Sequence, residues 1–128
     1  MGDLLFSQRA LREADAGLGV VTQAWSPLGG VNRYWNDNRD LVGDPLGDPA
    51  VTEIAARYGK TPAQVVLRWH LEHGLSAIPK SVRPHRIAEN FDVFDFALAA
   101  DEVAAIDAID TGVRGGPDPD VVGPGYFG

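Results

Sequence analysis

The chain of 128 residues contains no cysteine, only two lysines and no long apolar run. The absence of cysteine excludes a disulfide, a thiolate nucleophile and a zinc site built on Cys ligands. No stretch approaches the ~18 apolar residues that span a bilayer, so the sequence predicts no transmembrane helix. The first residues also lack the basic region of a signal peptide. A single domain in the cytoplasm is therefore the simplest expectation.

Positive charge is scarce as well, since 11 Lys and Arg face 18 Asp and Glu for a net charge of −7. Binding to nucleic acid or to an anionic membrane needs a broad basic face, so neither partner is expected. Lys80, Arg83 and Arg86 nevertheless gather in one turn, between a short apolar strand at 75–78 and the start of a helix. A helix N-terminus flanked by cations favours a phosphate. A solvated basic turn remains the alternative.

The first third of the chain predicts a helix, a strand and a long loop. Residues 7–16 are expected to be helical, with Ser7 as the N-cap and Gly17 as the stop. Residues 19–25 predict a buried strand, which ends at a turn rich in Pro and Gly over 26–30. The polar loop that follows, 31–48, carries Tyr34 and Trp35.

Helices dominate the remainder. A helix is expected over 49–58, closed by Gly59, and another from Thr61, where Pro62 and Gln64 complete a capping box. Trp69 lies on the predicted core face of that second helix. The strand at 75–78 and a helix over 84–90 follow, and then a last helix that runs to about residue 109, before a tail rich in Gly and Pro. The acidic residues of this last helix are expected to form a polar face rather than a catalytic pair: Asp101, Glu102, Asp107 and Asp110. Alternating strands and helices predict an α/β fold with a parallel sheet. Two apolar strands cannot form such a sheet alone, which points to part of something larger.

Three segments, in the same order and at similar spacing, resemble the aldo-keto reductases, most of all bacterial reductases of the 2,5-diketo-gluconate reductase type. They are residues 23–29, residues 61–69, and residues 78–81 with Arg86, Glu89 and Asn90. The resemblance extends over about residues 6–120. It implies a (β/α)₈ TIM barrel, of which this chain is the C-terminal portion, strands seven and eight with their helices, and is incomplete as a barrel. Residues 1–128 would then be one partial domain: a helix after the missing strand six (1–18), the last two β/α units and the C-terminal helix (19–111), and a C-terminal loop or tail (112–128).

The resemblance also implies a cofactor, NADPH, and roles for ten residues. Trp25 matches the aromatic ring that stacks on the nicotinamide. The pyrophosphate would be held by Ser26 and by the backbone of Leu28 and Gly29. Cations facing a dianionic 2′-phosphate favour NADPH over NADH. The 2′-phosphate would contact Lys80, Ser81, Arg86 and the backbone of Val82, and the adenine would contact Glu89 and Asn90.

No catalytic residue is assigned in this chain. In the family a Tyr acts as the general acid with a Lys, an Asp and a His, all on the first four strands. Tyr34, Tyr58 and Tyr126 have no Lys close in sequence that is placed to lower the pKa of the phenol, so we expect no catalysis by this chain alone. His70, His73 and His85 lack the spacing of metal ligands, so no metal is expected.

Two functions therefore stay open. In the first, the chain is the NADPH-binding segment of a reductase that acts on a small carbonyl substrate once the N-terminal half completes it. In the second, it is a non-catalytic nucleotide-binding or protein-interaction module derived from a truncated reductase. The open barrel edges would then serve self-association or a partner chain.

Overall fold

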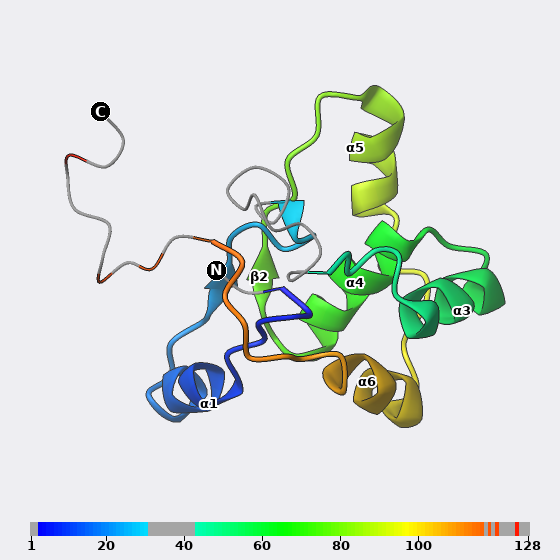
Figure 1. The fold of residues 1–128 in the computed structure, drawn as a ribbon. Helices are drawn as coiled ribbons and strands as arrows, with labels where there is room; N and C mark the ends of the chain where they lie inside the picture. Colours follow the sequence, from blue (N-terminus) through cyan, green and yellow to red (C-terminus); the bar gives the residue numbers. More distant parts are fainter. Residues whose placement is uncertain (1–2, 31–42, 117, 119, 121–124, 126–128) are drawn as a thin grey trace.

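A computed structural model describes residues 3–30, 43–116, 118, 120 and 125, and shows helices around a short parallel sheet (Figure 1). In chain order the elements are α1 (Arg9–Gly17), β1 (Gln23–Ala24), α3 (Pro49–Tyr58), α4 (Pro62–Glu72), β2 (Ser76–Ala77), α5 (Pro84–Phe91) and α6 (Ala100–Asp107). The described residues form one two-stranded sheet and no closed barrel. The predicted loop at 31–48 lies outside the described residues up to position 42, and so do Tyr34, Trp35 and Tyr126.

Local capping signals place α3 and α4 as the sequence predicts. The Asp48 carboxylate accepts a hydrogen bond from the Ala50 amide at the start of α3, and Gly59 ends that helix with a φ of 63°. Thr61 and Gln64 then form the expected capping box, in which each side chain accepts from the other residue's amide. These bonds satisfy N–H groups that a helix start otherwise leaves without a partner.

The start of α1 differs from the prediction. Gln8, not Ser7, is the N-cap residue, and it has a left-handed φ of 49°. The Ser7 hydroxyl instead donates to the carboxylate of Asp110, far along the chain. Gly17 is the last residue of the helix rather than the stop, and the left-handed turn comes at Gly19. The Ser7 prediction failed because a distant partner takes the hydroxyl that a local rule assigns to the cap.

The strands are shorter and more exposed than predicted. Only two residues of the expected strand at 19–25 and two of that at 75–78 pair, in the register Gln23 with Ser76 and Ala24 with Ala77. Val20 and Val21 are exposed, so the prediction of a buried first strand was wrong, and Ile78 of the second predicted strand is exposed as well. Each described strand has a single neighbour, so its other edge has no strand partner among the described residues.

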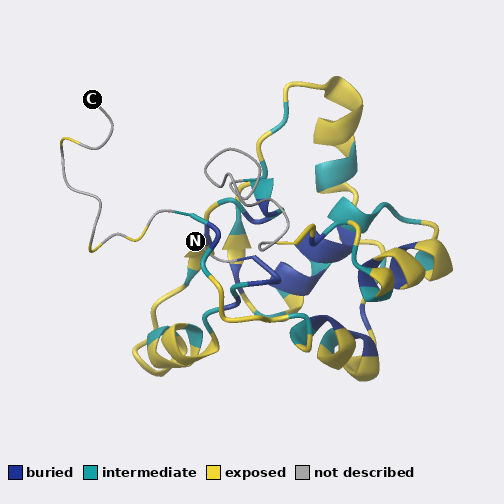
Figure 2. Ribbon diagram, viewed as in Figure 1, coloured by how far each residue is buried: buried dark blue, intermediate teal, exposed yellow. Residues whose placement is uncertain are grey.

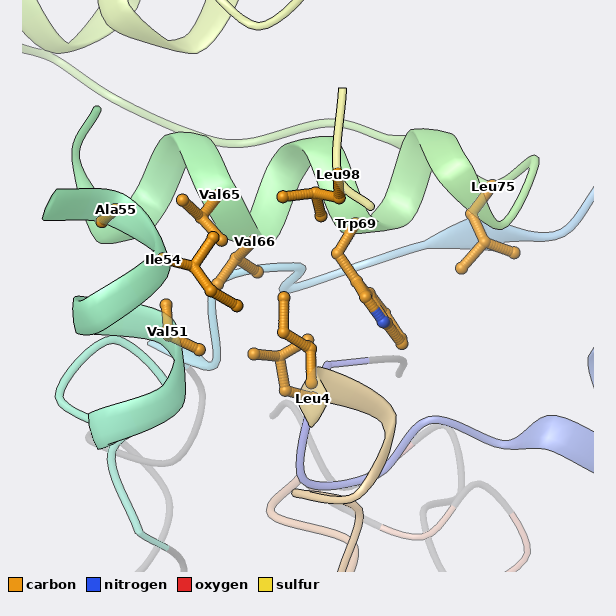
Figure 3. Packing of buried hydrophobic residues seen from close by; sticks show 10 residues of the cluster. Leu4, Val51, Ile54, Ala55, Val65, Val66, Trp69, Leu75 and Leu98 are labelled. Atoms are coloured by element: carbon orange, nitrogen blue, oxygen red, sulfur yellow. The ribbon is translucent and has the colours of Figure 1, made fainter. Parts of the chain in front are cut away.

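The hydrophobic core lies among α3, α4 and α6, and α4 is its centre (Figures 1 and 3). α4 packs against α3, α5, α6 and β2. Its buried residues include Val65, Val66 and Trp69, which belong to the same cluster as Ile54 of α3. Trp69 is 1% exposed, and its indole Nε1 donates to Asp107 of α6 at 2.9 Å, so the predicted core position is confirmed.

The position of Glu102 differs from the prediction for the last helix. The acidic residues of the last helix were expected to form a solvated polar face, yet Glu102 is buried. Its carboxylate accepts from Arg57 at 2.7 Å, from the Tyr58 hydroxyl at 2.7 Å and from the Ala99 amide at 2.9 Å. Burial alone would raise the pKa of Glu102, but these hydrogen bonds outweigh it and lower the pKa. Glu102 therefore joins the end of α3 to the start of α6.

Candidate functional site

The parallel register of β1 and β2 brings two distant turns to one edge of the sheet. Ala24 and Ala77 are partners across the sheet and are also the last residues of their strands. The segments that follow, 25–30 and 78–83, therefore leave the sheet at the same, carboxyl edge (Figure 1). In parallel α/β folds this is the edge that carries binding sites. The two segments contain most of the predicted site residues.

The turn after β1 has an unusual backbone. Ser26 has a φ of 56°, which is rare for a residue other than Gly, and Gly29 has a φ of 71°. The Gly29 amide donates to the Ser26 carbonyl at 3.0 Å, which closes the turn. Gly29 is buried, whereas Leu28 is partly buried and packs against the core. A left-handed Ser is a strained conformation of the kind that gathers at functional sites.

Trp25 stands at the start of this turn and is 50% exposed. It differs in this respect from Trp69, which the core encloses. An indole whose face is open to solvent can stack on another planar ring. The placement of Trp25 at the carboxyl edge is thus compatible with the predicted nicotinamide contact.

The turn after β2 presents the predicted phosphate residues to solvent. Lys80 and Val82 are exposed, and the Ser81 hydroxyl accepts from the Arg83 amide at 3.2 Å. α5 then begins at Pro84, and its N-cap residue, Arg83, provides no side-chain hydrogen bond to the first turn. A helix start without a side-chain cap has N–H groups and a dipole that favour an anion.

The cations of this segment lack acidic partners in the described part of the chain. Lys80, Arg83 and Arg86 form no ion pair with any residue that the structure describes. Lys60, the other lysine, contrasts with them: its side chain is 10% exposed, and its ammonium lies 3.0 Å from Asp92 and 2.8 Å from Asp95. In a protein with a net charge of −7, three cations without an ion pair among the described residues make this segment locally positive.

Arg86, Glu89 and Asn90 extend the predicted site along α5. Their spacing of three and four residues puts them on one face of the helix. Arg86 is exposed, and Glu89 and Asn90 are partly buried. α5 contains no buried residue, as its exposed surface in Figure 2 shows. The face is thus open to a ligand.

A small cavity of about 90 Å³ lies elsewhere, and no predicted site residue lines it. It borders α1, β1 and α4, and its lining includes Asp3, Arg12 and His70. Burial raises the pKa of Asp3, and one of its carboxylate oxygens finds no hydrogen-bond donor among the residues described. The described residues contain no cluster of three or more His, Asp or Glu suited to a metal ion. No helix in the described ranges is long and apolar enough to cross a membrane.

This geometry, two parallel strands whose carboxyl ends carry a cationic turn and an exposed indole, agrees with the comparisons with known proteins. A model of the aldo/keto reductase family matches residues 4–111, and the chain belongs to this family. Its fold is therefore that of a (β/α)₈ barrel, of which the structure shows a part without a closed barrel. The family resemblance predicted from the three motifs is confirmed.

Two curated relatives are similar in sequence to most of this chain. The chain is 53% identical over 115 residues to morphine 6-dehydrogenase from Pseudomonas putida, a match that covers 89% of this chain and 39% of the relative. It is 46% identical over 119 residues to methylglyoxal reductase DkgA from Escherichia coli K12, covering 93% of this chain and 40% of the relative. The chain thus spans about two fifths of the length of the curated relatives it matches.

A solved structure is similar in fold as well. A Gox0644 mutant, crystallised in complex with NADPH, superimposes with a TM-score of 0.81 at 43% sequence identity. The match covers 95% of this chain and 41% of the Gox0644 chain. The arrangement of α4, the two strands and the surrounding helices is therefore one that the solved structure of a relative also contains.

Proposed function

We propose that this chain is the NADPH-binding C-terminal segment of an aldo-keto reductase-like oxidoreductase. In this proposal residues 1–18 follow strand six of the barrel, residues 19–111 form the last two β/α units with the C-terminal helix, and residues 112–128 form the C-terminal loop. The whole protein would reduce a small aldehyde or ketone by hydride transfer from NADPH. The observation that carries the proposal is the meeting of two turns at one sheet edge, one with an exposed indole and the other with uncompensated cations.

The residues at the 2′-phosphate end fit a dianion. Lys80 and Arg86 supply charge without an acidic partner in the described ranges, and the Ser81 hydroxyl remains able to donate because it only accepts from the Arg83 amide. The first N–H groups of α5 and the Val82 backbone lie in the same turn. Arg and Lys facing a phosphate form hydrogen bonds about twice as strong as neutral ones. NADPH is therefore favoured over NADH, which lacks this phosphate.

The other proposed contacts with the cofactor come from the turn after β1 and from α5. Trp25 would hold one face of the nicotinamide, while Ser26 and the backbone of Leu28 and Gly29 would contact the pyrophosphate at the left-handed turn. Glu89 and Asn90, on the helical face that Arg86 shares, would contact the adenine. NADPH supplies the hydride when bound. This chain would orient the cofactor, and the proton donor would come from the N-terminal half of the barrel.

Binding of two nucleotides by the intact 128-residue chain tests the proposal. Calorimetric titration should show tighter binding of NADPH than of NADH. Lys80→Ala should weaken NADPH binding by about tenfold or more, since it removes a charged hydrogen bond, and leave NADH binding within about twofold. Arg83→Ala is the matched control, because it removes the same charge from the same turn outside the proposed contacts.

Three results would count against these assignments. Equal losses of NADPH and NADH affinity in Lys80→Ala would exclude the 2′-phosphate role. A wild-type chain that binds neither nucleotide would refute the proposed function. Turnover of an aldehyde with NADPH by the purified chain alone would show that the chain is not catalytically incomplete.

An interaction module is the second candidate, and exposed apolar side chains favour it. Leu18, Val20 and Val21 before β1, Phe91 at the end of α5 and Phe94 after it are more than half exposed. Such side chains, together with open strand edges, suit a partner chain or a second copy. Sedimentation of the chain over a range of concentrations, with and without NADPH, separates the candidates: an assembly that forms without any nucleotide binding would favour the module.

A further inference from the structure

α5 is held in place through α4. No residue of α5 is buried, and among the described helices and strands α5 packs against α4 alone (Figures 1 and 2). The apolar residues Ile87 and Phe91 of α5 are both exposed. Hydrophobic burial within α5 therefore contributes little to its position. Apart from the buried Val93 that follows the helix, polar contacts with α4 hold its C-terminal end.

These contacts come from three side chains spaced four residues apart in the sequence: Lys60, which lies just before α4, and Gln64 and Arg68 of α4. Gln64 and Arg68 lie one turn apart on the same face of α4. Each donates to a backbone carbonyl at or just after the end of α5. Gln64 reaches Glu89 at 3.0 Å and Asp92 at 3.1 Å, Lys60 reaches Asp92 at 3.1 Å, and Arg68 reaches Val93 at 3.2 Å. We call this row of donors the α4 clamp.

Gln64 is the central member of the α4 clamp and uses both ends of its amide. Its Oε1 accepts from the Thr61 amide at 2.9 Å, which is the capping-box bond. Its Nε2 makes both bonds to the end of α5, where the Glu89 carbonyl also accepts from the Asp92 amide at 3.0 Å. The side chain is buried. The capping box explains the oxygen of Gln64 but not the two bonds of its nitrogen.

We infer that Gln64 is a positioning residue for the adenosine end of the cofactor, because it fixes the helix that carries Arg86, Glu89 and Asn90. This inference rests on the proposed function. The Glu89 carbonyl is itself one of the two acceptors, so a residue assigned to the adenine is joined directly to α4. Gln64 need not touch the nucleotide. Its loss would let the contact face of α5 move relative to the turn of Lys80.

The variant Gln64→Glu distinguishes the capping role of the side-chain oxygen from the contacts that the side-chain nitrogen makes with α5. A Glu keeps the oxygen that caps α4, since Glu and Gln serve equally in a capping box, but faces the two carbonyls of α5 with an acceptor. Thr61→Ala is the matched control, because it removes the other half of the same capping box and leaves the donors of Gln64 in place. Gln64→Met serves as a second variant that lacks both ends.

Two ligands that each represent one end of NADPH provide the readout at pH 8. In Gln64→Glu the affinity for adenosine 2′-monophosphate should fall by about tenfold, while that for reduced nicotinamide mononucleotide should stay within about twofold. Thr61→Ala should lower thermal stability and change neither affinity. A Gln64→Glu chain that loses both affinities equally, or neither, would overturn the inference.

Hydrogen exchange of the ligand-free chains tests whether Gln64 positions α5, independently of whether the chain binds NADPH. Amides near the end of α5 should exchange about tenfold faster in Gln64→Glu and Gln64→Met than in the wild type, and not in Thr61→Ala. Unchanged exchange would refute the α4 clamp whatever the ligands do. Faster exchange in a chain whose wild type binds neither ligand would support the clamp but refute the proposed function, and the nucleotide role of Gln64 with it.

Discussion

The same residue types have opposite surroundings in two regions of the molecule. One is the packed region of α3, α4 and α6, and the other is the carboxyl edge, residues 25–30 and 78–83. Trp69 is enclosed in the packed region, whereas Trp25 is half exposed at the edge. Lys60 is bound by two aspartates, whereas Lys80 has no ion pair with a described residue. Groups that stabilise the fold are paired within it, and groups left exposed without such pairing are the ones available to a ligand.

Trp69→Ala should have the largest effect on stability. The indole is the largest fully buried side chain, and it donates to Asp107. Its removal should lower the free energy of unfolding by about 3–5 kcal/mol, as large-to-small changes in a core do. Chemical denaturation followed by far-UV circular dichroism measures this change.

A second variant keeps this prediction testable if Trp69→Ala does not fold. Trp69→Phe retains an aromatic ring and loses the hydrogen bond to Asp107, so it should be destabilised by roughly 1–2 kcal/mol. The region would not be a true core if Trp69→Ala were as stable as the wild type.

Glu102→Gln should come next, with a dependence on pH. It weakens the charged hydrogen bonds from Arg57, Tyr58 and Ala99 and should destabilise the chain by about 2 kcal/mol at neutral pH. Because the folded-state pKa of Glu102 lies below its ordinary value of 4.5, its contribution is present above that pH and lost as the pH falls through the folded-state pKa. The variant should therefore lose less stability than the wild type on acidification.

Thermal unfolding between pH 3 and pH 7 checks this sign. The exposed neighbour Asp101 gives the control, since Asp101→Asn should change stability by less than about 0.5 kcal/mol. Parallel pH profiles for the wild type and Glu102→Gln would show that the buried carboxylate does not contribute as proposed.

Ala99→Ser should act in the opposite direction and stabilise the chain by up to about 1 kcal/mol. Ala99 is the N-cap residue of α6 and has extended backbone angles, but its side chain has no oxygen to accept a hydrogen bond. Glu102 already accepts from the Ala99 amide, so a Ser hydroxyl would complete the capping box. Denaturant midpoints measure the gain, and Ala100→Ser, one residue inside the helix, should show none.

Local rules predicted the parts of this fold that depend on neighbouring residues. The boundaries of α3, α4 and α5 agree within about one residue, because Asp48, Gly59, Thr61 and Pro84 act on helix ends within a few positions. The same rules failed where a distant partner decides. Ser7 donates to Asp110, and Glu102 is buried by residues of another helix. No pattern in the sequence places these partners together.

The candidate site, too, could be predicted from the sequence only in part. Its motifs are local, so residues 25–29 and 80–90 could be selected from the sequence and the family resemblance. Their meeting at one edge follows from the parallel register of β1 and β2. The two bonds of Gln64 to α5 could not be predicted, since the capping box already accounted for that residue. Only the packing of α5 on α4 shows its second contact.

Trp25→Ala should have the smallest effect on stability, within about 0.5 kcal/mol, because the indole is half exposed and is absent from the core cluster. It should nevertheless weaken binding of reduced nicotinamide mononucleotide by about three- to tenfold, the worth of one aromatic stacking contact. Trp25→Phe should restore most of that affinity. Ligand titration by NMR and denaturation of the same samples measure both quantities. If Trp25→Ala instead lost as much stability as Trp69→Phe and kept its affinity, Trp25 would contribute to the packed region and not to the nucleotide site.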